Sequence, residues 1–152
     1  MIYEKRGNIA HITLNRPDVF NAFDEVQSYD LQAALKEANK DSEIRVVVLT
    51  GAGKAFCSGQ DLKAIAGSKN RSLSDSLYKR YNPIIKAMRE MPKPIIGRIN
   101  GVAAGAGGAM FELVALTLGC FRRIASTPRS VGPGGRGLHV LHELREALAR
   151  VA

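Results

Sequence analysis

Short apolar runs alternate along the chain with longer segments in which apolar residues recur at helical spacing. The first run, IAHITL at residues 9–14, lies between two turn-forming segments and is typical of a strand. The second run, IRVVVL at residues 44–49, is rich in β-branched residues, which predicts a strand buried on both faces, as in a parallel sheet. A third run, at residues 95–99, predicts another buried strand.

Two helices are predicted between these strands. The first begins at Asp24, whose side chain suits an N-cap, and runs to about Asn39. Its apolar residues at helical spacing are Val26, Leu31, Ala34, Leu35 and Ala38. The second covers residues 73–91, where we expect Pro83 to introduce a kink. Its apolar positions are Leu77, Tyr81, Ile84, Ile85 and Met88. This order of elements predicts an α/β fold with crossover connections.

The composition is that of a globular domain. The chain has 152 residues, of which 45% are apolar and 24% charged, a length that suits one domain with its own core. Two cysteines, Cys57 and Cys120, give neither a disulfide framework nor a cysteine-based zinc site. The charged N-terminus does not resemble a secretory signal. The weakly polar run at residues 101–121 is interrupted by Glu112, which argues against a membrane span. We therefore expect a cytoplasmic protein.

Charge is distributed unevenly along the chain. The formal net charge is +8, which favours anionic partners without separating nucleic acid from a small phosphorylated ligand. Residues 1–108 hold nine Lys, seven Arg and eleven acidic residues, whereas residues 109–152 hold six Arg, three Glu, no Lys and no Asp. The chain therefore divides into residues 1–108 and a compositionally different tail at residues 109–152.

Two glycine-bearing loops follow predicted strands. The first loop is Gly53–Leu62 and the second loop is Asn100–Gly108. Small residues let a ligand approach the main chain closely, and a helix opening in the second loop would favour negative charge at its N-terminus. Two such loops side by side can aim two backbone N–H groups at one oxygen, which is an oxyanion hole. Neither loop matches a P-loop or the dinucleotide-binding pattern, and glycine-rich turns are most often structural.

Three motifs in this order resemble the crotonase superfamily, the enoyl-CoA hydratase/isomerase family. They are Asn15-Arg16-Pro17 with Asn21-Ala22-Phe23, then VVVLTGAGKAFCSGQDL, then MPKPIIGRINGVAAGAG. Tyr81-Asn82-Pro83 and details of both loops are most similar to the branch that contains the ring-1,2-epoxyphenylacetyl-CoA isomerase. The resemblance covers residues 1 to about 108. It implies a crotonase-like spiral of ββα units, here truncated, whose missing C-terminal helices would build trimers or hexamers.

The resemblance also implies an activity and a set of site residues. Members act on acyl-CoA thioesters in fatty-acid or aromatic-acid degradation and need no cofactor, because coenzyme A is part of the substrate. Two backbone N–H groups stabilise a thioester enolate, and on this sequence they fall at Gln60 and Ala106. The expected substrate-binding residues are Gln60, Asp61, Leu62, Lys63, Gly105 and Ala106. Lys63, Lys54 and Arg16 are candidates for the CoA phosphates, although solvated surface roles are as good a reading of each.

The family's acid/base carboxylates have no clear counterpart. Ala109 stands where hydratases carry a Glu, a position that the ring-isomerase branch also leaves without one. Glu112 is the nearest carboxylate, and a surface role suits it better than catalysis. Residues 120–126, CFRRIAS, resemble a displaced version of a family segment. The acid/base carboxylate is therefore unassigned, and we expect residues 109–152 to include frame-shifted or truncated sequence, with an amphipathic helix at residues 138–151.

Several other residues suit structural roles. Cys57 is expected to be a small packed residue, His11 a strand residue, and Asp61 a stabiliser of its own turn. His139 and His142 lie three residues apart with no third ligand in view, so no metal site is expected.

Two other functions remain as alternatives to an acyl-CoA hydratase/isomerase. One is a catalytically inactive fragment that binds acyl-CoA or another subunit. The other is nucleic-acid binding, which the absence of a basic stripe interleaved with aromatic residues disfavours.

Overall fold

The computed structural model describes residues 1–66 and 77–105 of the chain. The strands are β1 (Ile2–Arg6), β2 (Ile9–Leu14), β3 (Val46–Gly51), β4 (Ala55–Cys57), β5 (Ile95–Arg98) and β6 (Val102–Ala103). The helices are η1 (Pro17–Val19), α1 (Glu25–Lys40), α2 (Leu62–Ala66), η2 (Leu77–Tyr81) and α4 (Asn82–Glu90). The tail at residues 109–152, with its predicted helix, lies outside the described residues, as do Glu112, Cys120, His139 and His142.

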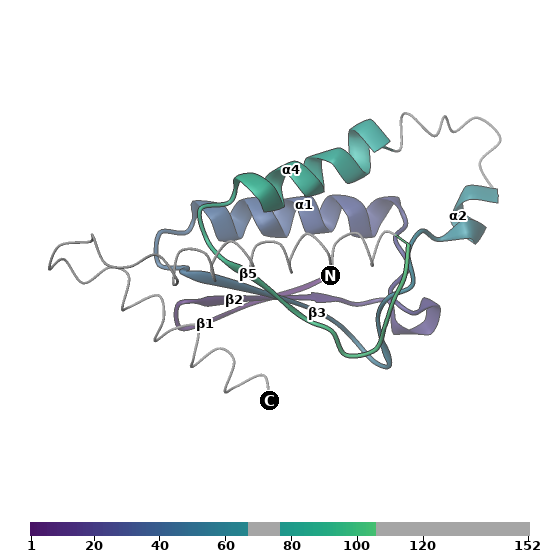
Figure 1. Ribbon diagram of the computed structural model, residues 1–152, viewed down its shortest axis with the longest axis horizontal. Coiled ribbons are helices and arrows are strands. Elements are labelled where there is room, and N and C mark those ends of the chain that lie inside the picture. The colour runs from purple at the N-terminus through teal and green to yellow at the C-terminus, as the bar shows by residue number, and fades with distance from the viewer. Residues whose placement is uncertain (67–76, 106–152) are drawn as a thin grey trace, which may run out of the picture.

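A four-stranded sheet carries the fold, in the order β1-β2-β3-β5 (Figure 1). Strands β2, β3 and β5 are parallel, so the predicted parallel sheet with crossover connections is confirmed. Strand β1 pairs antiparallel with β2 and was not predicted. Its sequence, IYEKR, is mostly exposed at the sheet edge and therefore has no buried face to create an apolar alternation.

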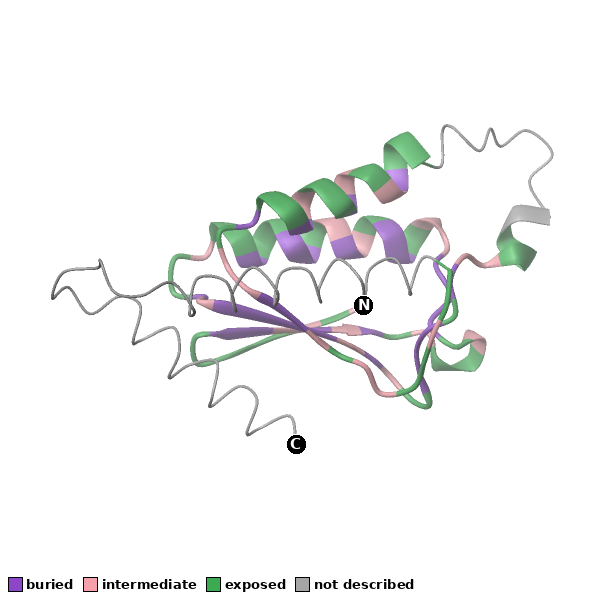
Figure 2. Cartoon of the chain, in the orientation of Figure 1, coloured by how far each residue is buried: buried purple, intermediate pink, exposed green. Residues whose placement is uncertain are grey.

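Helices α1 and α4 lie side by side on one face of the sheet (Figure 1). The predicted cap is confirmed, because Asp24 Oδ1 accepts a hydrogen bond from the Gln27 N–H at 2.8 Å. Leu31, Ala34, Leu35 and Ala38 are buried beneath α1, as predicted. Val26 was wrongly predicted as an inward position: it is 67% exposed, because Gln27 and Ser28 face the core in the first turn. Figure 2 shows the buried residues on the sheet-facing sides of both helices.

The second predicted helix has two described parts rather than one kinked span. Leu77–Tyr81 forms a π-helical turn, and α4 follows directly from Asn82. Pro83 stands in the first turn of α4, where its missing N–H costs no helical hydrogen bond. Ile84 and Met88 are buried as predicted, whereas Leu77 and Ile85 are 45% and 37% exposed.

The core lies between this sheet and the two helices. Its largest fully buried side chains include Phe23, Phe56, Leu31, Leu35 and Leu49. Strands β4 and β6 form a separate two-stranded parallel sheet beyond the carboxyl ends of β3 and β5. These strands are three and two residues long, too short for any hydrophobic period to predict them. They lie within the two glycine-bearing loops, which form the candidate site.

Candidate active site

The two glycine-bearing loops are held against each other by the small β4–β6 sheet. Cys57 pairs with Ala103, and the Ala104 N–H donates a hydrogen bond to the Cys57 carbonyl oxygen at 2.9 Å. Beyond this pairing the chains stay close: a Cβ atom on Gly105 would lie 3.5 Å from the Gly59 Cα atom. The loops therefore lie side by side, as an oxyanion hole built from both requires.

Gln60 is placed by a backbone bridge to Phe23. The Phe23 N–H donates to the Gly59 carbonyl oxygen at 2.7 Å, and the Asp61 N–H donates to the Phe23 carbonyl oxygen at 2.9 Å. Because successive backbone groups of an extended chain point to opposite sides, the Gln60 N–H points away from Phe23. Within residues 1–66 and 77–105 it donates to no acceptor. Among the described residues, the Gln60 N–H is thus a backbone donor without an acceptor.

Ala106, the second expected donor, lies outside the described residues. The structure follows the second loop as far as Gly105, one residue earlier. Ala109, which stands at the hydratase Glu position, is also outside the described range. Both assignments therefore stay predictions.

Asp61 stabilises the turn that carries Gln60, as the sequence predicted. Its Oδ1 atom accepts hydrogen bonds from the N–H groups of Lys63 and Ala64, at 3.1 and 3.2 Å, at the start of α2. Its Oδ2 atom accepts from Arg16 Nη2 at 3.0 Å. The hydrogen bond from the Ala64 N–H, followed by that from the Arg16 guanidinium, lowers the pKa of the Asp61 carboxyl from its ordinary value. Asp61 is therefore a carboxylate at neutral pH with its oxygens engaged.

Arg16 supports the same turn. Its Nη1 atom donates to the Ala22 carbonyl oxygen at 2.6 Å and lies 3.4 Å from Asp24 Oδ2, while Nη2 reaches Asp61. The guanidinium therefore connects the Asn15-Arg16-Pro17 motif to the first loop. These contacts give Arg16 a structural role, and the phosphate contact considered for it stays a prediction.

Three other expected binding residues are open to solvent. Leu62 is 75% exposed, and the side chains of Lys63 and Lys54 are exposed. Neither lysine forms an ion pair with any residue that the structure describes. Both ammonium groups remain accessible to an anionic ligand near the first loop.

Cys57 is a packed residue rather than an exposed thiol. It is fully buried in β4, and burial raises the pKa of its thiol above the ordinary value. Its Sγ atom lies 3.4 Å from the Gly59 nitrogen, which donates to it. A buried thiol of raised pKa is a poor nucleophile. His11 is a half-buried residue of β2, as expected of a strand residue.

Two asparagines near the loops have roles that the sequence analysis did not predict. The Nδ2 atoms of Asn21 and Asn100 both donate to the carbonyl oxygen of Ala55, at 2.8 and 3.3 Å. Asn21 has a left-handed backbone with φ of 56° and is completely buried. Asn21 lies in the turn after η1, where Asn tolerates a left-handed backbone better than most residues, and this is the signal that the sequence offers for it.

Tyr81 also lies near the first loop without a role predicted for its hydroxyl. Its ring packs edge-on against Phe23, with centroids 6.4 Å apart. The Tyr81 hydroxyl oxygen is buried and finds no hydrogen-bond partner within the part of the chain that the structure describes. Burial raises the pKa of this phenol from its ordinary value.

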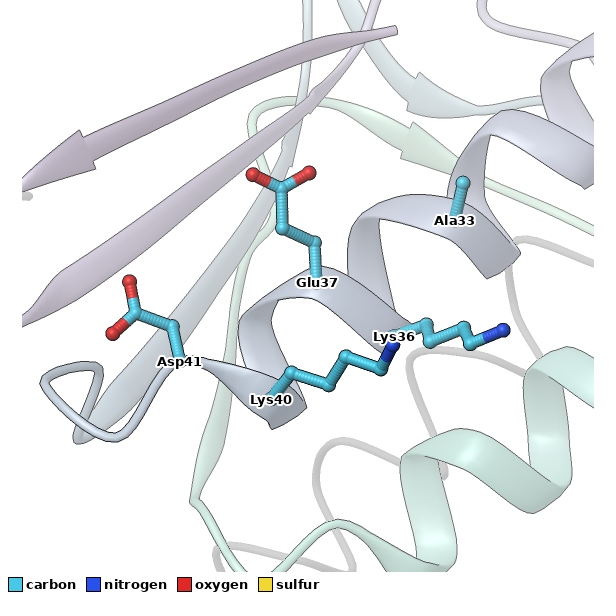
Figure 3. A pocket seen from close by; sticks show the side chains of 5 residues that line it. All are labelled: Ala33, Lys36, Glu37, Lys40 and Asp41. Atoms are coloured by element: carbon cyan, nitrogen blue, oxygen red, sulfur yellow. The ribbon is translucent and has the colours of Figure 1, made fainter.

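An open hollow on the surface lies far from these loops, at the C-terminal end of α1 (Figure 3). Its lining residues are Ala33, Lys36, Glu37, Lys40 and Asp41. Figure 3 shows Glu37 and Asp41 on the side of the strands and both lysines directed the other way. Helix α1 begins beside the first loop and ends here, so the hollow is at the opposite end of the sheet.

The described part of the chain shows neither a metal-binding cluster nor a membrane-spanning helix. Across residues 1–66 and 77–105, His, Cys, Asp and Glu side chains form no group of three or more that could hold a metal ion. Within those ranges, no helix has both the length and the apolar character to cross a membrane.

The chain is similar to known proteins in sequence and in fold. Residues 4–118 match the family model described as enoyl-CoA hydratase/isomerase. Over 102 residues the chain is 40% identical to the 1,2-epoxyphenylacetyl-CoA isomerase of Escherichia coli, which covers 65% of this chain and 39% of that protein. Over 130 residues it is 38% identical to the (E)-benzylidenesuccinyl-CoA hydratase of Thauera aromatica, covering 85% of this chain and 48% of that one.

Solved structures give the same result for the fold. The enoyl-CoA hydratase of Mycobacterium smegmatis superposes with a TM-score of 0.69 at 33% identity, covering 74% of this chain and 44% of that chain. The present chain spans less than half the length of each of these relatives. The predicted crotonase-like fold is therefore confirmed, and this chain corresponds to part of the fold seen in the longer relatives.

Proposed function

The chain belongs to the enoyl-CoA hydratase/isomerase family, and we propose that it binds an acyl-CoA thioester and stabilises the enolate of its acyl group. The two donors to the enolate oxygen are the backbone N–H groups of Gln60 and Ala106. The observation that carries the proposal is the Gln60 N–H, which has no acceptor within residues 1–66 and 77–105, on a turn whose Gly59 lies against Gly105 of the second loop. Ala106 follows Gly105 directly.

The chemistry follows from where negative charge develops. When the proton α to the thioester carbonyl leaves, its electron pair forms an enolate and the charge moves to the carbonyl oxygen. Two fixed N–H donors stabilise that oxygen more than the neutral carbonyl and so lower the barrier, each donor contributing about 3 kcal/mol. The Phe23 bridge and the Arg16–Asp61 ion pair hold Gln60 in place before substrate arrives.

The exposed part of the first loop suits the rest of the ligand. Residues Gln60 to Lys63 line the groove for the adenine and pantetheine of CoA, while Gly105 lies on the other side of the reacting carbonyl. The ammonium groups of Lys63 and Lys54 meet the CoA phosphates. Coenzyme A arrives as part of the substrate, so the reaction needs no separate cofactor.

The acid/base residue remains unassigned. Asp61 is the nearest described carboxylate to Gln60 in sequence, and its hydrogen bonds to α2 and Arg16 occupy it structurally. The choice between hydration and double-bond isomerisation depends on that missing group. We infer a cytoplasmic role in fatty-acid or aromatic-acid degradation, with the family's trimer or hexamer as the assembly. Size-exclusion chromatography with light scattering tests the assembly.

A conjugated aryl acyl-CoA, such as cinnamoyl-CoA, tests the oxyanion hole directly. Its absorption moves to longer wavelength when hydrogen bonds polarise the thioester carbonyl. The variant Q60P removes the N–H of residue 60, while Q60A removes the side chain and keeps the N–H. We expect the purified chain to shift the absorption, Q60A to retain most of that shift, and Q60P to lose it. Circular dichroism checks that both variants fold.

The absorption measurement also has a clear negative outcome. A red shift that Q60P retains would show that the donors lie elsewhere. Binding without any red shift would remove the oxyanion hole from the proposal.

A second candidate is a non-catalytic fragment that binds acyl-CoA or another subunit. It is favoured by the matched length, less than half of each relative, and by the unassigned acid/base carboxylate. Crotonyl-CoA hydration or double-bond isomerisation by the purified chain would exclude this candidate. Binding and a red shift without turnover would support it.

A further inference from the structure

One main-chain oxygen, the carbonyl oxygen of Ala55, accepts hydrogen bonds from two side chains that lie far apart in sequence. Asn21 Nδ2 reaches it at 2.8 Å and Asn100 Nδ2 at 3.3 Å. Ala55 is the first residue of β4, the strand that leads into the Gly59–Asp61 turn. Asn100 precedes β6, which leads to Gly105. The shared acceptor is therefore linked along the chain to both loops.

Asn21 approaches Ala55 from the side of the first motif. Its Nδ2 atom also donates to the Ala52 carbonyl oxygen at 2.9 Å, and its Oδ1 atom accepts from the Arg16 N–H at 2.8 Å. The backbone carbonyl oxygen of Asn21 accepts from Gln27 Nε2 at 2.9 Å. The amide is thus fully engaged in a completely buried position.

Asn100 approaches from the side of the second loop. Its Nδ2 atom donates to the Gly53 carbonyl oxygen at 2.9 Å, in addition to Ala55. Its Oδ1 atom accepts from the Gly51 N–H at 3.2 Å. A single amide therefore spans the turn between β3 and β4.

The main chains around this turn touch. A Cβ atom on Gly101 would lie 2.1 Å from the Lys54 carbonyl oxygen, and one on Gly51 would lie 2.3 Å from the Ala55 carbonyl oxygen. Only glycine permits such approaches without movement of the backbone. The backbone atoms of this turn are in close contact with Gly51 and Gly101, so a displacement of Ala55 would move these glycines too.

From these contacts we infer that Asn21 and Asn100 are positioning residues that clamp Ala55 and so fix the spacing between the two loops. The inference rests on the proposed function only for its consequence, the spacing of the donors at Gln60 and Ala106. The clamp itself concerns the free protein. Neither asparagine is placed on the substrate.

Amide hydrogen exchange, followed by NMR on the ligand-free chain, tests the clamp. One reporter is the N–H group of Asp61 in the first loop, which donates to the Phe23 carbonyl oxygen. The other is the N–H group of Ala104 in the second loop, which donates to the Cys57 carbonyl oxygen. The variants are N100A, N21G and the double variant; glycine tolerates the left-handed backbone at position 21. The control is N8A, which removes one exposed amide bonded to the Glu43 carbonyl oxygen at the other end of the sheet.

We expect N100A and N21G each to speed exchange at both reporters by about tenfold, the effect of losing a buried hydrogen bond, while N8A leaves them within about twofold. The double variant should exchange little faster than the faster single variant, because losing either asparagine already frees the Ala55 carbonyl. Equal acceleration at the reporters and at Val48 in the core strand would mean global destabilisation and would overturn the inference. If N21G does not fold, the partly exposed N100A decides alone.

The cinnamoyl-CoA red shift provides the functional readout. N100A should reduce the shift by a larger factor than it reduces the affinity for CoA itself, since Lys63, one of the two proposed phosphate contacts, lies outside the segment that Asn100 contacts. An unchanged red shift in N100A would overturn the positioning role. If the unmodified chain gives no red shift, the proposed function fails, and the exchange experiment still decides whether the clamp exists.

Discussion

Polar side chains make different kinds of contact at the two ends of the four-stranded sheet. At the carboxyl ends of the parallel strands, the amides of Asn21 and Asn100 hydrogen bond to main-chain groups. At the amino ends, Lys5 Nζ pairs with Asp41 and Glu43 at the surface, at 2.7 and 2.5 Å. One end fixes the backbone, and the other places side-chain charges in solvent.

The difference matters because the two kinds of contact differ in strength and direction. Breaking a buried hydrogen bond leaves an unpaired polar group and costs about 1 to 3 kcal/mol, whereas exposed ion pairs contribute little and are screened by salt. Bonds to the main chain also set the path of the chain. The main-chain contacts of Asn21 and Asn100 therefore lie where the proposed donors need a fixed spacing.

Lys93 is an exception at the amino end. Its Nζ atom donates to the carbonyl oxygens of Ala38, Asn39 and Asp41, at 2.6, 3.0 and 2.6 Å. These carbonyls end helix α1, where a cation is favourable. A charged side chain thus anchors the main chain here too. Replacing Lys93 therefore tests whether main-chain contacts, and not the end of the sheet, determine stability.

The largest effect is expected from G51A at the carboxyl end. The new Cβ atom would meet two carbonyl oxygens, of Ala55 and Phe56, at 2.3 and 2.4 Å, so the backbone must move. We expect the free energy of unfolding to fall by about 3 kcal/mol or more, measured by urea denaturation. The control is G7A at the amino end, where nothing lies within 4 Å and only the positive φ of 59° is unfavourable, costing about 1 kcal/mol. Equal losses in both would remove the contrast between the ends.

The variant K93M should have the next largest effect. It keeps the length of the side chain and removes the ammonium donor from three helix-terminal carbonyls. We expect a loss of about 2 kcal/mol in unfolding free energy, the range for hydrogen bonds to a charged group. K86M in α4 is the matched control, since Lys86 is exposed and lies 4.0 Å from Glu90. A loss no greater than that of K86M would show that the anchor contributes nothing.

The variant D61N tests the ion pair at the first loop through its pH dependence. Because the folded pKa of Asp61 is below its ordinary value, its stabilisation is present above about pH 4 and disappears as the pH falls through the folded pKa. We expect D61N to lose about 1 kcal/mol at pH 7, with the difference from the unmodified chain shrinking in acid. Asn can still cap α2, so the ion pair with Arg16 is the main loss. A difference that stays constant between pH 7 and pH 2 would contradict this.

The smallest effect is expected from K5M at the amino end. The side-chain hydrogen bonds to Asp41 and Glu43 raise the pKa of Lys5, yet all three groups are at the surface. We expect a thermal melt indistinguishable from that of the unmodified chain in 0.15 M salt, where exposed charges are screened. A clear drop in melting temperature, comparable with that of K93M, would show that surface charge pairs fix this end as well.

The larger elements could be predicted because their residues repeat a periodic environment. Leu31 and Leu35 face the core one turn apart, and the buried run at residues 44–49 belongs to the central strand β3. The prediction that Val26 faces the core was wrong because the Asp24 cap orients the first turn of α1, with Gln27 and Ser28 turned inward. Strand β1 was missed because an exposed edge has no apolar alternation.

The candidate site could be predicted only in part from the residues themselves. The two glycine-bearing loops indicated only that an oxyanion hole could form if they lie side by side, and Gln60 was implied by the resemblance to the family. The convergence of Asn21 and Asn100 on Ala55 could not be predicted, because the two asparagines are 34 and 45 residues away from Ala55 in the sequence. Tertiary contacts of this kind leave no period in the sequence. The expected donor at Ala106 stays a prediction.

The oxygen that ties the two loops together belongs to the main chain, so no substitution at position 55 can delete it. Genetic change can reach this contact only through the residues around it. Variants meant to test the proposed function should therefore leave Asn21, Asn100 and Gly51 unchanged, except where the contact itself is under test. The Tyr81 hydroxyl beside Phe23 differs, because within the described residues nothing hydrogen bonds to it, so the change Y81F would break no hydrogen bond seen there.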